Sequence, residues 1–193
     1  MLRLRPLKRV YLAPGEGVEA LGSVPGTDRL EVVLSNHLVR YALLPWSPQL
    51  TSSGDWHAYA QHVFGTTYGS DAGAWRIRIC DSGRGKARVA CAADASLLDE
   101  ISAVERVDSI QPHLMAAFND RRGEFEAAPG WFVLHEPGRL VLGLVADDEW
   151  KLVRSRQAPA DWRESLPDLL HREAAVTGLP NCERLVLSFG LAA

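Results

Sequence analysis

Two strand–turn motifs contain the residues that come closest, in type and spacing, to phosphate chemistry. They run from residue 10 to 15 and from 133 to 138, and each ends in a Pro-Gly pair. Proline fixes φ, and glycine accepts the positive φ that a tight reversal needs. We expect each motif to join two strands, the first pair covering residues 8–21 and the second pair continuing at 140–142. Two similar motifs, each at the head of its own half, indicate a duplicated α/β unit.

The position two residues before each glycine decides what chemistry these turns could support. In duplicated folds that bind nucleotide phosphates between their halves, an aspartate stands there and manages a metal ion and phosphate. This chain has Ala13 before Gly15 and Glu136 before Gly138. We therefore interpret both as degenerate phosphate-binding turns and expect no catalytic residue, no cofactor and no metal. The alternative left open is an active ATP-dependent phosphotransferase or ATPase that uses Glu136 with Mg²⁺.

Other stretches carry only fragments of a catalytic or metal-binding signature. Residues 81–87 look superficially like a phosphate loop, but Cys80 stands where glycine is required and Ala87 where serine or threonine would meet Mg²⁺. A strand follows this stretch, where a helix N-terminus would be needed to meet the anion, so we expect a hairpin turn. His57 and His62 are five residues apart, which is too far around a helix for two ligands on one face.

The composition is that of a globular chain without a basic field. Of 193 residues, 47% are hydrophobic, so the chain can bury a core. The net charge of −3 and a pI near 6.1 argue against nucleic acid as a partner. Cys80, Cys91 and Cys182 have neither pairing nor metal spacing, so we expect reduced thiols and a cytoplasmic location. The longest apolar run, residues 140–146, is too short to span a bilayer, so we expect no membrane insertion.

The region from about residue 30 to 107 reads as β-β-α-β-β-α. Its expected strands lie at 30–34, 39–44, 75–80 and 87–91. One helix follows residue 53 and ends at Gly65, and the other is capped by Asp94. We expect these elements to form an antiparallel sheet covered by helices and inserted into the first half. A strand at 109–111, a helix that begins at Pro112 and a polar linker at 121–130 then lead to the second half.

The second half has a simpler pattern. Its expected strands lie at 131–134, 140–145, 150–153 and 184–187, with a helix from Trp162 to Ala174 before the last one. Three antiparallel strands, a helix and a returning strand are typical of the opening of a ribonuclease H-like unit. We therefore divide the chain into a first half at 1–122 and a second half at 130–193.

One loop tryptophan suggests a contact surface. Trp46 lies between Pro45 and Pro48, where a large apolar ring has no evident role in a core. An exposed aromatic residue beside prolines can anchor a protein partner, and we expect Tyr41, Leu44 and Trp46 to be partner-binding residues. The alternative is that the Trp46 ring folds back over a sheet edge.

Four stretches carry a resemblance to a known family. Residues 34–46, 92–98, 107–118 and 131–190 resemble the actin-like cytoplasmic domain of the type II secretion L protein and its relative, the type IV pilus M protein. The resemblance implies an α/β protein of two ribonuclease H-like, or actin-like, halves, the first with an inserted β-β-α-β-β-α subdomain. Ala13 and Glu136 depart from the family's phosphate turns, and the chain ends after Ser188-Phe189-Gly190, where the adenosine-contacting turn would begin.

The resemblance and these departures together imply a function through contacts. We expect a non-catalytic cytoplasmic scaffold or assembly protein of a pilus or type II secretion-like system. The implied partner is a protein, such as an inner-membrane component of that assembly, and a second copy of the chain is a further candidate.

Overall fold

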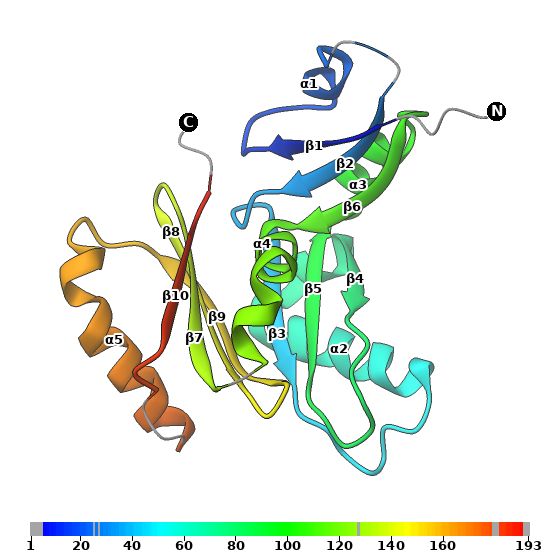
Figure 1. The fold of residues 1–193 in the computed structure, drawn as a ribbon. Coiled ribbons are helices and arrows are strands. Elements are labelled where there is room, and N and C mark those ends of the chain that lie inside the picture. Colours follow the sequence, from blue (N-terminus) through cyan, green and yellow to red (C-terminus); the bar gives the residue numbers. More distant parts are fainter. Residues whose placement is uncertain (1–5, 25, 27, 127, 179–181, 191–193) are drawn as a thin grey trace.

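The computed structural model describes residues 6–24, 26, 28–126, 128–178 and 182–190, which form three sheets (Figure 1). The first sheet has the order β1-β2-β6, the second β3-β5-β4, and the third β10-β7-β8-β9. This mixed α/β architecture agrees with the expected class. One continuous core cluster joins side chains of the first and third sheets, among them Leu12, Val32, Phe132 and Leu134. The two sheets therefore share a hydrophobic interior.

The first sheet consists of three parallel strands. They are β1 (Leu7–Leu12), β2 (Arg29–Leu34) and β6 (Val107–Pro112). The short helix α1 (Glu19–Gly22) follows β1, so the strand expected at 18–21 is wrong. Backbone hydrogen bonds from Ala20 to Gly17 and from Leu21 to Val18 close a helical turn there, and Leu21 is fully buried. Local hydrogen bonding and the burial of one leucine override the apparent strand pattern.

The second sheet is antiparallel and contains three of the four strands expected in it. They are β3 (Val39–Leu44), β4 (Trp75–Ile79) and β5 (Arg88–Asp94). The fourth, β2, lies in the first sheet instead, because it pairs parallel with β1 and β6. The helical elements of this region are α2 (Ser53–Tyr68), η1 (Gly69–Ala74) and α3 (Ala95–Ser102). The side chains of Trp56 and Phe64 from α2 pack on Ile77.

Two of the predicted helix starts hold, while α4 begins at His113, one residue after Pro112, and one predicted end does not hold. Ser52 and Asp55 form a reciprocal capping box at the start of α2, and the Asp94 carboxylate accepts hydrogen bonds at the start of α3. The α2 helix passes through Gly65 and ends at Tyr68. Gly69, with φ of +68°, provides the left-handed conformation that ends it. Gly65 has no neighbour that requires a glycine, so its presence was a weak stop signal.

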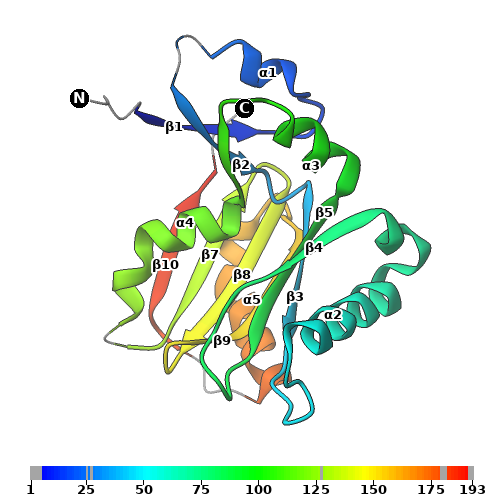
Figure 2. The same cartoon turned by 90° about the vertical axis from the view of Figure 1, so that its right-hand side faces the viewer.

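The third sheet confirms the meander and returning strand expected from the sequence. Its strands are β7 (Gly130–Glu136), β8 (Arg139–Ala146), β9 (Glu149–Gln157) and β10 (Leu185–Phe189), the last parallel to β7. Helix α5 (Trp162–Thr177) packs Trp162, Leu166 and Leu170 on one face. On the other face lie α4 (His113–Arg121) and η2 (Arg122–Phe125), as Figure 2 shows. No helix in the described part of the chain is long and apolar enough to cross a membrane.

Candidate functional site

The Glu136 carboxylate lies at the end of β7 and is 5% exposed. It accepts hydrogen bonds from Ser35 Oγ at 2.6 Å and from Asn36 Nδ2 at 2.8 Å. The backbone N–H of Asn36 donates to both carboxylate oxygens at 3.1 Å, and His113 Nδ1 lies 2.5 Å from Oε1. Donors from the β2–β3 turn and from the start of α4 therefore surround the acid that stands two residues before the glycine of the second Pro-Gly turn.

These donors keep Glu136 ionised. Burial alone would raise the pKa of its carboxyl, but hydrogen bonds from His113, Ser35 and Asn36 favour the carboxylate and outweigh burial. The pKa of Glu136 therefore lies below its usual value. A carboxylate with this many charge-assisted hydrogen bonds acts as a structural tie between the turn after β2 and the turn after β7.

Asn36 is fully buried and extends the network. Its Oδ1 accepts from the Tyr41 hydroxyl at 2.6 Å and from the backbone N–H of Leu114 at 3.2 Å. Tyr41 is only 8% exposed and Leu44 is fully buried, so the expectation that these two residues form a contact surface is wrong. The two side chains point to opposite faces of the second sheet, and both faces are covered: Tyr41 packs in the core cluster shared with the first and third sheets, and Leu44 packs with Trp56 and Phe64 of α2. Trp46, at 41% exposure, is the predicted partner-binding residue that lies at the surface.

Gly190 closes the network from the end of β10. Its N–H donates to the His135 carbonyl at 2.7 Å. A Cβ at this position would lie 2.7 Å from Glu136 Cγ, closer than real Cβ contacts, and 3.0 Å from His113 Cε1, which is tighter than most of them. Glycine is therefore required for β10 to end beside the carboxylate.

The first turn is occupied by an acid of its own. Glu16 Oε2 accepts the backbone N–H of Ala13 at 2.7 Å. Backbone N–H groups of such turns are the donors that bind phosphate oxygens in other proteins. Gly15 and Gly138 have φ of +83° and +76°, so both predicted Pro-Gly turns form. In the first turn, the Glu16 carboxylate therefore occupies the position at which the Ala13 N–H could bind a phosphate oxygen.

A cavity of about 670 Å³ lies between the two turns. It is lined from the first turn by Tyr11, Ala13 and Glu16, and from across the cavity by Ser35, His113, Glu136 and Gly190. His37 Nε2 lies 2.9 Å from the Pro137 carbonyl and connects the β2–β3 turn to the second Pro-Gly turn. The polar groups that face this cavity are largely bonded to one another. Within the described ranges, no group of three or more His, Cys, Asp and Glu side chains could hold a metal ion.

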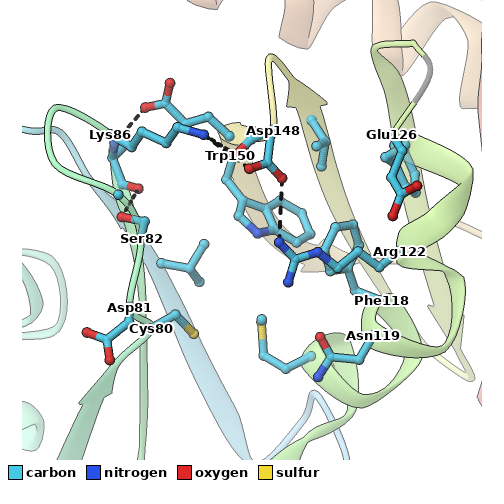
Figure 3. Close-up of a pocket in the computed structure, with 17 residues that line it drawn as sticks. Cys80, Asp81, Ser82, Lys86, Phe118, Asn119, Arg122, Glu126, Asp148 and Trp150 are labelled. Atoms are coloured by element: carbon cyan, nitrogen blue, oxygen red, sulfur yellow. Dashed lines mark hydrogen bonds and ion pairs between the residues drawn. The ribbon is translucent and has the colours of Figure 1, made fainter.

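A second pocket, of about 410 Å³, lies where the β4–β5 hairpin, α4 and the β8–β9 turn meet (Figure 3). Its floor is apolar, with the Phe118 and Trp150 rings 4.4 Å apart. On the rim, Lys86 and Arg122 both point to Asp148, at 3.2 and 3.5 Å. Hydrogen bonding to Lys86 lowers the pKa of the Asp148 carboxyl. The stretch 81–87 is thus a hairpin turn, as expected, and its lysine holds another turn of the chain.

The sequence did not reveal the partners of Glu136. Ser35 and Asn36 lie between the strands expected at 30–34 and 39–44, and His113 follows the proline at the expected helix start, so neither position has a signature of its own. An asparagine beside a buried strand is the one signal that could have suggested an internal hydrogen-bond network. The three cysteines, which all lie in the described part, form no disulfide with one another. Burial raises the pKa of the Cys91 thiol to about 12.

Comparison with known proteins identifies the fold. No protein-family model matches the chain, and no curated protein matches its sequence. Among solved structures, it is similar to the cytoplasmic domain of EpsL, an inner membrane component of the type II secretion system of Vibrio cholerae. The TM-score is 0.61 at 13% identity, over 97% of this chain and 83% of that chain.

Two further solved structures are similar. One is a protein of Bacteroides thetaiotaomicron with an actin-like ATPase fold and unknown function, with a TM-score of 0.56 at 9% identity, over 86% of this chain and 60% of that one. The other is the PilM-PilN type IV pilus biogenesis complex, with a TM-score of 0.47 at 14% identity, over 79% and 48%. The first two likenesses confirm the actin-like fold that the sequence resemblance implied.

Proposed function

We propose that this protein is a non-catalytic cytoplasmic scaffold or assembly protein of a pilus or type II secretion-like system. The observation that carries the proposal is that the acids in both phosphate-type turns bind the protein itself. Glu136 accepts from Ser35, Asn36 and His113, and Glu16 accepts from the Ala13 amide.

The chemistry of phosphoryl transfer explains why this matters. Catalysis of that reaction depends on metal ions held by free carboxylates and on N–H groups that face the phosphates. To bind Mg²⁺, the Glu136 carboxylate would have to give up hydrogen bonds that stabilise its buried charge. To bind a phosphate oxygen, the Ala13 amide would have to release Glu16. Both exchanges oppose nucleotide binding.

The likeness to the EpsL cytoplasmic domain supports the choice of system. That domain belongs to an inner membrane component of a secretion system. We infer that this chain likewise contacts a protein of an inner-membrane assembly, rather than nucleic acid or the bilayer itself. Its exposed Trp46, held in a loop with two prolines, is the proposed anchor for that contact.

Thermal unfolding with and without millimolar ATP and Mg²⁺ tests the absence of nucleotide binding. A ligand at a hundred times its Kd would stabilise the fold by about 2.7 kcal/mol and raise Tm by several degrees. We expect no such rise. A matched variant, Glu16→Gln, replaces the carboxylate that accepts the Ala13 N–H with a weaker amide acceptor. It shows whether Glu16 alone prevents that N–H from binding a phosphate oxygen. ATP turnover that disappears in Glu136→Gln would replace the scaffold by the ATPase alternative.

The scaffold role itself is tested by affinity purification from the native cell with the Trp46→Ala variant as control. We expect an inner-membrane component of a pilus or secretion assembly to be retained by the wild type and reduced with the variant. Retention of metabolic enzymes alone would contradict the proposal.

A further inference from the structure

Strand β10 is an edge strand without the protection found on the other sheet edges. Edge strands expose unpaired backbone groups, and soluble proteins guard them with charges or proline. Every other edge strand of the three sheets carries at least one charged residue, namely Arg9 in β1, Arg40 in β3, Arg76 in β4, Asp108 in β6 and Lys151 in β9. The sequence of β10, Leu-Val-Leu-Ser-Phe, has neither charge nor proline. In the described part of the chain, no further strand pairs with it, and Figure 2 shows β10 as the outermost strand of its sheet.

The hydrogen bonds of β10 to β7 define which backbone groups are open. Gly190 N–H donates to the His135 carbonyl, and the Arg184 carbonyl accepts from Trp131 N–H. In a parallel ladder, alternate residues direct both backbone groups to the same neighbour. The even-numbered residues therefore bond β7. Leu185, Leu187 and Phe189 direct their N–H and C=O groups to the open edge.

Of these three residues, Leu185 and Leu187 line a groove beside α5, and the Phe189 ring lies 6.4 Å from the ring of Trp162 at the start of α5. Leu185 is 40% exposed and Phe189 is 54% exposed, and Leu187 packs partly on the core under α5. The groove has a volume of about 390 Å³. The edge therefore presents open backbone groups and exposed apolar side chains together, which is the combination that a further β-strand fits.

Opposite charges mark the two ends of this edge. Glu183 lies just before Leu185 and lines the groove. At the other end, the Arg163 guanidinium lies 5.7 Å from the Phe189 ring centroid. Neither charged group forms an ion pair with any residue in the described ranges. An edge that is apolar in the middle, with an acid at one end and a base at the other, is complementary to itself when turned by 180°.

We propose that β10 pairs antiparallel with the β10 strand of a second copy of this chain, with Leu187 on the two-fold axis. In this register, the open groups of Leu187 pair with those of the partner subunit's Leu187. Leu185 pairs with the partner subunit's Phe189, and all three outward N–H groups find acceptors. Glu183 then meets the partner's Arg163 at both ends. The two four-stranded sheets become one sheet of eight strands.

Sedimentation equilibrium of the full chain over a range of micromolar concentrations tests this interface. We expect a concentration-dependent dimer. Glu183→Arg and Arg163→Glu should each weaken dimerisation about tenfold, because each places like charges together twice. The double variant should recover most of the wild-type affinity, because the pairs form again with reversed sign. Leu185→Lys should abolish the dimer. Val176→Lys, at an exposed position on α5 with 77% exposure, is the control and should leave it unchanged.

Hydrogen exchange measured on the same samples locates the contact. Peptides that contain residues 185–189 should become more protected as concentration rises, while circular dichroism shows each variant folded. A monomer at every concentration would overturn the proposal, and so would a double variant as weak as the single ones. The inference rests on the scaffold proposal only for its use in the cell. ATP binding and dimerisation are separate measurements, and either can fail alone.

Discussion

Asn36 and Glu136, 100 residues apart in the chain, form a paired contact in which both the backbone and the side-chain amide of Asn36 donate to one carboxylate. The asparagine belongs to the turn after β2, and the glutamate ends β7. The contact fixes the first sheet to the third at the place where an actin-like protein with intact phosphate turns would keep its acid available for ligand. Because the Glu136 carboxylate holds the two sheets together, its hydrogen bonds contribute to the free energy of unfolding.

Replacing Glu136 should destabilise the protein strongly. Glu136→Gln removes the charge and turns an NH₂ group towards donors from Ser35, Asn36 and His113. The loss of one partner from a buried, charge-assisted network costs about 3–5 kcal/mol. Urea unfolding measures the change. Glu105→Gln, at an exposed position after α3, is the control and should lie within about 0.5 kcal/mol of wild type. Equal stability of the two variants would mean that the Glu136 tie adds little.

The same tie predicts acid sensitivity. Hydrogen bonds lower the pKa of Glu136 in the folded state, so its contribution is fully present above the unfolded-state pKa of about 4.3. That contribution declines as the pH falls from there through the folded-state pKa, because the unfolded chain binds the proton more readily. Urea unfolding of wild type and Glu136→Gln between pH 3 and 7 should show the two curves converging at low pH. Parallel curves would contradict the assignment.

Two glycines should respond to alanine in opposite directions. Gly190→Ala places a methyl group against Glu136 and His113, and overpacking of this kind costs about 1–3 kcal/mol. Gly65→Ala lies inside α2 with open space around it, so alanine should stabilise the helix by up to about 1 kcal/mol. Thermal unfolding of both variants checks the pair. A stabilising Gly190→Ala would show that the end of β10 does not press on the Glu136 network.

Alanine variants of Trp46 and Leu44 should distinguish a residue that contacts a partner from a residue that packs in the core. Trp46→Ala should leave Tm nearly unchanged and weaken partner binding by about 2 kcal/mol, as expected for an interface anchor. Leu44→Ala creates a cavity beside a fully buried position and should destabilise the fold by about 2–5 kcal/mol. Differential scanning calorimetry and a binding titration distinguish the two. A large loss of Tm in Trp46→Ala would remove that residue from the contact surface.

The second half was predictable because its pattern is local. Strands β7, β8 and β10 of the third sheet are nearly continuous apolar runs, and α5 shows its buried stripe at Trp162, Leu166 and Leu170, so these elements could be recognised within short windows. In the first half, β2 is an ordinary apolar strand, and nothing local says that it pairs with β1 rather than with β3. Residues 18–21 are too few for their periodicity to distinguish a helical turn from a strand.

The candidate site was half predictable for the same reason. The Pro-Gly turns at Gly15 and Gly138 could be recognised because proline and glycine restrict the backbone locally. The donors to Glu136 come from elements distant in the chain, and their convergence depends on how the sheets pack. The sequence could therefore show that Glu136 stands at the turn, but not that Ser35, Asn36 and His113 would all bond to its carboxylate.

Gly190 has a consequence for the order of folding. Ser35, which donates to the Glu136 carboxylate, precedes it in the chain by about a hundred residues. Gly190, which packs against Glu136 at the end of β10, follows it by 54 residues and is therefore the last of its neighbours to be synthesised. A nascent chain that has not yet emerged beyond α5 leaves this charge exposed along the open side of β7. The joint between the first and third sheets is therefore completed only after β10 has been synthesised, and a chain released before that point leaves it unfinished.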